Sequence, residues 1–361
     1  MVWSRSRHLL VTCCCLLSPR KMSHIAQAEM SPVRLGLVGE PSGRANEVIY
    51  VKPSSPTPSL PSPVLVFFGG DVQDYPEVMA AHRDHKRYVD WSLTSTASLL
   101  AAKFPAHHVL IIKPSRMERK TFSCYDNFVI SNSVGAPTHA PEGTALTYLA
   151  SLILETLRKA QALQTSIGDE NPTADQGLQG SNIDDSSQSL CHKSLSDITE
   201  AQECNTDLPK TNDHCLKNEL KETEFSEVSF IGFSKGCVVL NQIITELHTL
   251  MAIQQQTQQQ DGFIKKIRNM YWLDGGHAGG RDTWITSPSI LKSLAARQHI
   301  TIHIHVTPYQ VRDEFRPWIG KECKSFHDIL RRAGAKVNYS LHFEEEAPTL
   351  LLHFNVLNHF T

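Results

Sequence analysis

The residues best suited to chemistry run from Gly232 to Gly236 and read Gly-Phe-Ser-Lys-Gly. In this GxSxG pattern, the glycines two positions before and after the serine permit a turn too tight for larger side chains. An apolar strand pattern ends at Ile231 and an apolar helical stripe begins near Cys237, so Ser234 is predicted on a sharp strand-to-helix turn. Such a turn exposes a serine as a nucleophile beside the positive end of a helix. The plainer interpretation is a glycine-rich turn in which the serine only caps the helix.

Acyl transfer also needs hydrogen-bond donors at the point where negative charge develops on the substrate oxygen. The backbone N–H of Lys235, next to the serine, is one candidate donor. The residues Gly69-Gly70-Asp71-Val72 directly follow an apolar strand, and their glycines would let the backbone approach a substrate. We therefore expect the second donor to be the N–H of Asp71 or of Val72. The Lys235 side chain is compatible with an anionic substrate, but a surface lysine is the plainer interpretation.

A base and an orienting acid should follow the serine in the order Ser…Asp/Glu…His. His353 lies just beyond the last predicted strand, on what we expect to be a loop, and is the candidate base. Two carboxylates satisfy the order. Asp313 comes after the strand ending at Val306, and Asp274 ends the strand before that one. We prefer Asp313 as the acid, because its strand immediately precedes the one that leads to His353, and keep Asp274 as the alternative.

A metal site is the chemical rival to this hypothesis. His303 and His305 alternate on one face of a strand, and Asp274 and His277 end its expected neighbour, a combination that could bind zinc. Strand histidines more commonly pack or form hydrogen bonds within the sheet, and the chain has no HExxH motif. We therefore predict no metal. We predict no organic cofactor either, because the chemistry is intrinsic to the side chains.

The elements that must position these residues alternate between strand and helix. Expected strands span 33–38, 47–51, 64–68, 108–113, 228–231, 267–273, 300–306 and 337–343, and expected helices span 93–104, 142–163, 237–250 and 321–333. The first two strands are expected to pair antiparallel. The rest of this alternation predicts a doubly wound, mostly parallel α/β sheet with sites at the carboxyl ends of its strands. With the serine turn, the fold class is that of an α/β-hydrolase.

Composition divides the chain into a leader and one folded domain. Residues 1–28 contain four basic residues and no acid, which is typical of a mitochondrial transit peptide for the matrix. A secretory signal is the runner-up, because residues 8–17 are apolar but too short to span a bilayer. A single domain is expected over 33–361, with a Pro/Ser linker at 53–63 and a polar, disordered insertion at 164–224.

Charge and cysteine content exclude some classes of protein. The formal net charge of −2 argues against a nucleic-acid partner, and no segment predicts a transmembrane helix. The nine cysteines are odd in number and form no CxxC pair, so a reducing compartment is the simpler interpretation.

Five blocks carry a resemblance to a known family: FFGGDVQ, FSCYDNF, IGFSKGCVVLNQ, MYWLDGGH and HVTPYQVRD. In this order they resemble a metazoan family of mitochondrial proteins, known in mammals as the uncharacterised product of a chromosome 2 open reading frame. The resemblance covers residues 64–135 and 225–361. It implies an α/β-hydrolase-like fold, a mitochondrial location and a link to respiratory function, with no established substrate.

Two classes of function follow from these features. The leading hypothesis is a serine hydrolase acting on an ester or thioester, such as a lipid or an acyl carrier, or transferring the acyl group to an acceptor other than water. The second is a non-catalytic scaffold that keeps the hydrolase fold to bind a protein partner, with the polar insertion as an interaction segment.

Overall fold

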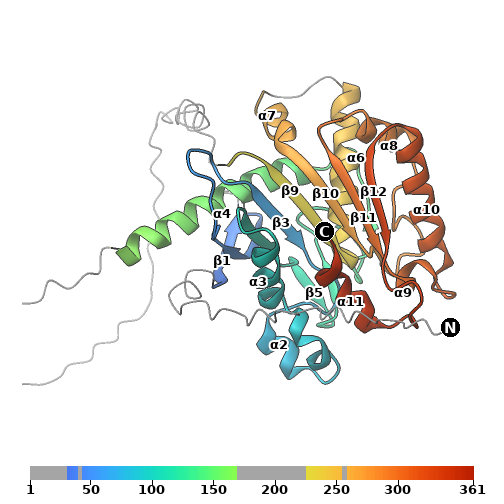
Figure 1. Cartoon of the computed structure of the whole chain (residues 1–361), viewed down its shortest axis with the longest axis horizontal. Helices are drawn as coiled ribbons and strands as arrows, with labels where there is room; N and C mark the ends of the chain where they lie inside the picture. The colour runs from blue at the N-terminus through green and yellow to red at the C-terminus, as the bar shows by residue number, and fades with distance from the viewer. Residues whose placement is uncertain (1–30, 40–42, 169–224, 254–257) are drawn as a thin grey trace, which may run out of the picture.

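The structure is a computed structural model that describes residues 31–39, 43–168, 225–253 and 258–361 (Figure 1). The predicted leader and most of the predicted insertion lie outside these residues. Helix α4 (Ala145–Gly168) continues past the predicted start of the insertion at residue 164, so that boundary was placed too early. Residues 254–260 are rich in glutamine, and the last three of them lie in helix α7 (Gln258–Lys266).

One eight-stranded sheet organises the described part of the chain, in the order β1-β2-β4-β3-β9-β10-β11-β12. These strands span Val33–Gly39 (β1), Ala45–Val51 (β2), Val64–Phe68 (β3), His108–Ile112 (β4), Val228–Phe233 (β9), Ile267–Leu273 (β10), Thr301–Val306 (β11) and Lys336–Leu341 (β12). Strand β2 pairs antiparallel with β1 and β4, and all the other neighbours are parallel. The carboxyl ends of six parallel strands therefore meet at one edge of the sheet.

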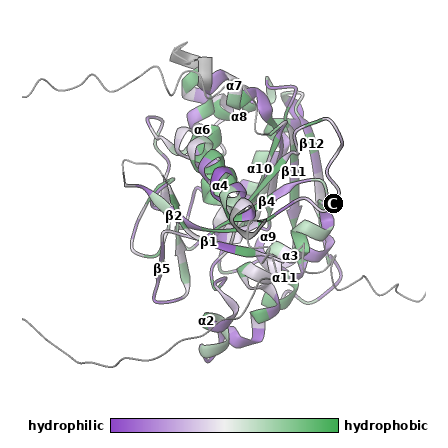
Figure 2. Cartoon of the chain, turned by 90° about the vertical axis from the view of Figure 1, so that its left-hand side faces the viewer, coloured by the Kyte–Doolittle hydropathy of each residue, from purple (hydrophilic) through white to green (hydrophobic). Residues whose placement is uncertain are grey.

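Helices cover both faces of this sheet (Figure 1). Alternate side chains of the strands pack on one side against α4, α6 (Cys237–Ile253), α8 (Pro288–Ala295) and α10 (Pro317–Arg332). The opposite side chains pack against α3 (Leu93–Lys103) and α11 (Leu350–His359). Because the central strands β3 and β4 are buried on both faces, they read as almost continuous apolar runs. The edge strand β12 has mostly exposed or half-buried residues and is coloured largely as hydrophilic in Figure 2.

Short elements near the carboxyl edge were not predicted. They are α2 (Pro76–Ala81), the 3-10 helix η1 (His85–Trp91), α9 (Pro308–Val311) and two small hairpins, formed by β5 (Arg116–Glu118) with β6 (Phe122–Cys124) and by β7 (Ile130–Ser131) with β8 (Pro137–Thr138). Helices α7, α8 and α11 were also not predicted. Elements of two to ten residues present too few periods for a hydrophobic pattern to stand out.

The predicted fold class is confirmed. The mostly parallel sheet, the helices on both faces and the serine turn after β9 are those of an α/β-hydrolase fold. Among the described residues, no helix combines the length and apolar character needed to cross a bilayer.

Candidate active site at the end of strand β9

Ser234 occupies a left-handed backbone conformation directly after β9, with φ of +51°. The turn leads through the 3-10 helix η3 (Ser234–Gly236) into α6. A Cβ on Gly232 would lie 2.8 Å from the Cα of Cys237, and a Cβ on Gly236 would lie 2.0 Å from the carbonyl oxygen of Phe68. Both glycines are therefore required by close backbone approach, as the GxSxG spacing predicts for a nucleophile turn.

The strain at Ser234 gives a stability prediction. A left-handed conformation costs a residue with a Cβ about 1–2 kcal/mol, and glycine avoids this cost. We expect Ser234→Gly to be more stable to unfolding than Ser234→Ala by about 1 kcal/mol, measured by chemical denaturation. The matched control is Ser229, within β9, where the glycine variant should instead be the less stable of the two. Equal stability of the two Ser234 variants would contradict the strain.

The loop after β3 lies directly against the serine. A Cβ on Gly70 would approach the Cβ of Ser234 to 2.7 Å, so only glycine fits there. Val72 has φ of +74°, a strained value for a β-branched residue. Its N–H donates to the carbonyl oxygen of Thr121 at 2.8 Å and is therefore already engaged within the protein. The N–H of Asp71 therefore remains the candidate oxyanion donor in this loop.

The Lys235 side chain is fully buried, which corrects the expectation of a surface lysine. Its Nζ donates to the carbonyl oxygen of Val134 at 2.9 Å and lies 3.3 Å from Oδ1 of Asp71. The ammonium is thus bound within the protein, and it gives no support to an anionic substrate. The backbone N–H of Lys235 is at the first turn of η3, where N–H groups have no acceptor within the helix.

His353 is paired with Asp274, the alternative acid. Nδ1 of His353 and Oδ2 of Asp274 are 2.7 Å apart, and both side chains are buried. The N–H and hydroxyl of Thr307 also donate to this carboxylate, at 2.8 and 2.6 Å. Asp274 has φ of +47°, a conformation that aspartate tolerates at the end of a strand. Thr307 was not selected from the sequence. The pattern that could have indicated it is a polar residue placed directly after a buried strand.

His353 lies in helix α11, not on a loop as expected. Its ring stacks on Phe233, the residue before the serine, with centroids 4.7 Å apart, and lies 5.1 Å from the ring of Tyr309. These contacts place the imidazole beside the serine turn. No hydrogen bond joins Ser234 to His353 among the described residues, and such bonds often form only in the substrate complex.

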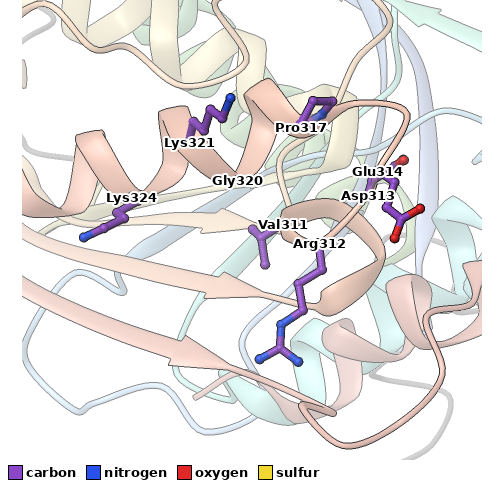
Figure 3. Close-up of a pocket in the computed structure, with 8 residues that line it drawn as sticks. All are labelled: Val311, Arg312, Asp313, Glu314, Pro317, Gly320, Lys321 and Lys324. Carbon is purple, nitrogen blue, oxygen red and sulfur yellow. The ribbon is translucent and has the colours of Figure 1, made fainter.

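The structure pairs Asp313, the preferred acid, with Arg316 and not with His353. Its carboxylate accepts hydrogen bonds from the Arg316 side chain at 2.6 Å and from the backbone N–H of Phe315 at 2.8 Å. Desolvation raises the pKa of Asp313, but the hydrogen bonds from Arg316 and from the N–H of Phe315 together lower it below its usual value. Asp313 lines a surface pocket that contains none of the three residues Ser234, His353 and Asp274 (Figure 3). The short helix α9 separates Asp313 from the end of β11 and carries it away from the site.

The strand histidines form a stacked group. His303 stacks on Tyr271 with centroids 4.1 Å apart, and Nδ1 of His305 lies 2.9 Å from Nε2 of His342. Desolvation lowers the pKa of His303 and of His305 to about 4 each. Within the described ranges, no three His, Cys, Asp or Glu side chains are grouped so as to hold a metal ion. His303 and His305 instead make ring and hydrogen-bond contacts within the sheet.

Comparisons with known proteins identify relatives by sequence. A family model described as C2orf69 matches residues 35–336. The human mitochondrial protein C2orf69 is 41% identical over 315 residues, which cover 84% of this chain and 77% of the human protein. The zebrafish (Danio rerio) mitochondrial protein C2orf69 homolog is 33% identical over 332 residues, which cover 89% of this chain and 83% of the homolog.

Solved structures of hydrolases are similar at low sequence identity. A thermostable esterase is 11% identical, with a TM-score of 0.39, and the match covers 89% of this chain and 57% of the esterase. This chain thus spans little more than half the length of that esterase. The Bacillus cereus carboxylesterase is 8% identical, with a TM-score of 0.32, and the match covers 88% of this chain and 94% of that chain.

Proposed function

The chain belongs to the C2orf69 family, and on that premise we propose that it is a mitochondrial serine hydrolase that cleaves an ester or thioester bond. Ser234 Oγ attacks the acyl carbon, and Nε2 of His353 accepts the serine proton and returns it to the leaving group. Water, deprotonated by His353, then cleaves the acyl–serine bond and restores the serine hydroxyl. Asp274 orients the imidazole through Nδ1. The backbone N–H groups of Lys235 and Asp71 stabilise the oxyanion.

The observation that carries this proposal is the buried Asp274–His353 pair beside a left-handed serine. The two residues are 79 positions apart in sequence, yet they form a 2.7 Å hydrogen bond at the same sheet edge as Ser234. Because Nδ1 donates to the carboxylate, Nε2 is left as the acceptor that a serine base requires. A scaffold that only binds a partner has no need for this tautomer or for a strained serine.

The apolar surroundings of the pair favour a substrate with an apolar acyl part. Phe354, next to His353, stacks with Tyr88 at 5.2 Å and with Trp91 at 5.6 Å between centroids. Tyr88 and Trp91 are half-buried, so both remain partly accessible to solvent. Aromatic and aliphatic walls with a few polar groups are usual in sites for small acyl substrates.

A mitochondrial location is supported by the names of the relatives and by the acid-free, basic composition of residues 1–28. We propose import into the matrix and a role in support of respiration. The three described free cysteines, Cys124, Cys237 and Cys323, are buried, as suits a compartment that keeps thiols reduced.

The test is covalent labelling by a fluorophosphonate probe of purified protein without residues 1–28. We expect the wild type to be labelled, and we expect Ser234→Ala and His353→Ala to lose labelling while remaining folded by circular dichroism. The loss follows because the probe reacts only with an activated serine. Folded wild-type protein that is not labelled would contradict the proposal and would favour the partner-binding scaffold.

A further inference from the structure

A buried ion pair joins the two residues whose backbone N–H groups are the proposed oxyanion donors. The Lys235 side chain has no exposed surface, and the Asp71 side chain is 29% exposed. Their charged atoms lie 3.3 Å apart. Burying an ammonium group costs several kcal/mol, and apolar residues of the same size would usually serve stability as well or better. The charged pair therefore needs an explanation beyond stability.

The pair belongs to a network that joins three segments. Oδ1 of Asp71 accepts a hydrogen bond from the N–H of Ser123 in β6 at 2.8 Å, and the Ser123 hydroxyl donates to the carbonyl oxygen of Gly70 at 2.5 Å. Nζ of Lys235 donates to Val134, in the turn between β7 and β8. The loop after β3, the serine turn and the two hairpins are thus held to one another through this pair.

We propose that the Lys235–Asp71 pair is a brace that fixes the spacing between the two oxyanion donors and keeps the charge beside them balanced. This inference rests on the proposed function. Both are positioning residues, because their side chains act through their own backbone N–H groups. Displacement of a donor by about 1 Å is enough to lower a rate about 100-fold.

Charge balance predicts which of the two residues, Lys235 or Asp71, should cause the larger loss of rate when its charge is removed. An unpaired Asp71 carboxylate would repel the oxyanion that forms nearby, and this repulsion is strong where water is excluded. Burial raises the pKa of Asp71 and the Lys235 ammonium opposes that effect, so labelling is compared at a pH high enough to keep Asp71 ionised without Lys235. Removal of Lys235 should therefore lower the rate more than removal of the Asp71 charge, and removal of both should partly restore balance.

The experiment is a double-mutant cycle on the rate of fluorophosphonate labelling, with Lys235→Met, Asp71→Asn and the double variant. We expect losses of about 100-fold for Lys235→Met and about 10-fold for Asp71→Asn. The double variant should lose no more than Lys235→Met alone, whereas independent effects would multiply to about 1000-fold. The control Lys113→Met removes another lysine, one that pairs with Glu47 and Asp74, and should label at the wild-type rate. Multiplicative losses would overturn the brace.

Hydrogen exchange tests the brace without labelling. The N–H of Val72 is bonded to Thr121 and reports opening of the loop after β3. In Lys235→Met, peptides covering 69–73 should exchange at least about 10-fold faster than in the wild type or in Lys113→Met, a ratio equivalent to about 1.4 kcal/mol. Unchanged exchange would overturn the brace even if labelling is normal. Absent wild-type labelling with faster exchange would instead reject the hydrolase, and would keep only a structural link between the loop after β3 and the serine turn.

Discussion

Replacing Asp274 with asparagine is expected to lower the rate of Ser234 labelling about 10⁴-fold while leaving the protein folded. Oδ1 of Asp274 accepts from the backbone N–H of Thr307, and Oδ2 accepts from both the Thr307 hydroxyl and His353. An asparagine that keeps its oxygen toward the Thr307 N–H must turn its amide nitrogen toward His353. The imidazole would then accept at Nδ1 and carry its proton on Nε2, where it cannot take the proton of the serine.

The matched control is Asp313→Asn. Asp313 also accepts hydrogen bonds from a side chain and from the backbone, but its partners are Arg316 and the N–H groups of Phe315 and Arg316. We expect its labelling rate to stay within about 3-fold of the wild type, because Asp313 makes no direct contact with His353 among the described residues. Its stability should fall by at most about 1 kcal/mol with the loss of the Arg316 ion pair. Labelling rates should be compared at saturating probe, with unfolding midpoints measured in parallel. A large loss in Asp313→Asn together with normal labelling in Asp274→Asn would contradict the assignment of the acid.

The central part of the fold could be predicted because its signals are local. Strands β3 and β10 were predicted with their observed bounds. Strand β3 is an uninterrupted apolar run ended by glycine, and β10 finishes in the apolar stretch Met270–Leu273, ended by aspartate. Ser234 could be placed on its turn for the same reason: the strand, the two glycines and the helix all lie within one short stretch of sequence. Periodicity and backbone sterics act over a few residues and therefore leave a readable pattern.

Local sequence patterns do not decide between Asp274 and Asp313 as the acid. The decision depends on how far the loop after each strand carries the carboxylate from the edge of the sheet. Asp274 ends β10 and remains at the sheet edge, whereas Asp313 follows β11 only after α9 has intervened. Chain order allows both residues. Thr307 distinguishes them, since its N–H and hydroxyl fix the Asp274 carboxylate toward His353. Such a contact between neighbouring strands has no signature in either strand alone.

The burial of Lys235 is a second feature that depends on distant segments. From sequence, a lysine after the nucleophile is expected at the surface, because lysine is rarely buried without a partner. Its partners are Asp71 and the carbonyl oxygen of Val134, which belong to a loop and a hairpin turn far away in the chain. The short hairpins that surround it were not predicted, so neither was its environment.

Replacing Gly236 with alanine is expected to lower the free energy of unfolding by about 3 kcal/mol or more and to abolish labelling of Ser234. The added Cβ would lie 2.0 Å from the carbonyl oxygen of Phe68 and 2.8 Å from that of Gly69. Both contacts are with backbone, so no side-chain rotation can relieve them. The serine turn would have to move away from the end of β3, which carries the loop with the second oxyanion donor.

The control for this variant is Gly262→Ala in helix α7, where an added Cβ meets nothing within 4 Å. That change should raise the free energy of unfolding by about 1 kcal/mol, because alanine favours a helix interior over glycine. The two alanine variants thus add the same methyl group with opposite expected signs, and denaturant titration of both measures the difference. A Gly236→Ala protein with wild-type stability and labelling would show that the serine turn and β3 can separate freely. The close backbone contact of Gly236 with Phe68 and Gly69 would then not be what positions the oxyanion donors.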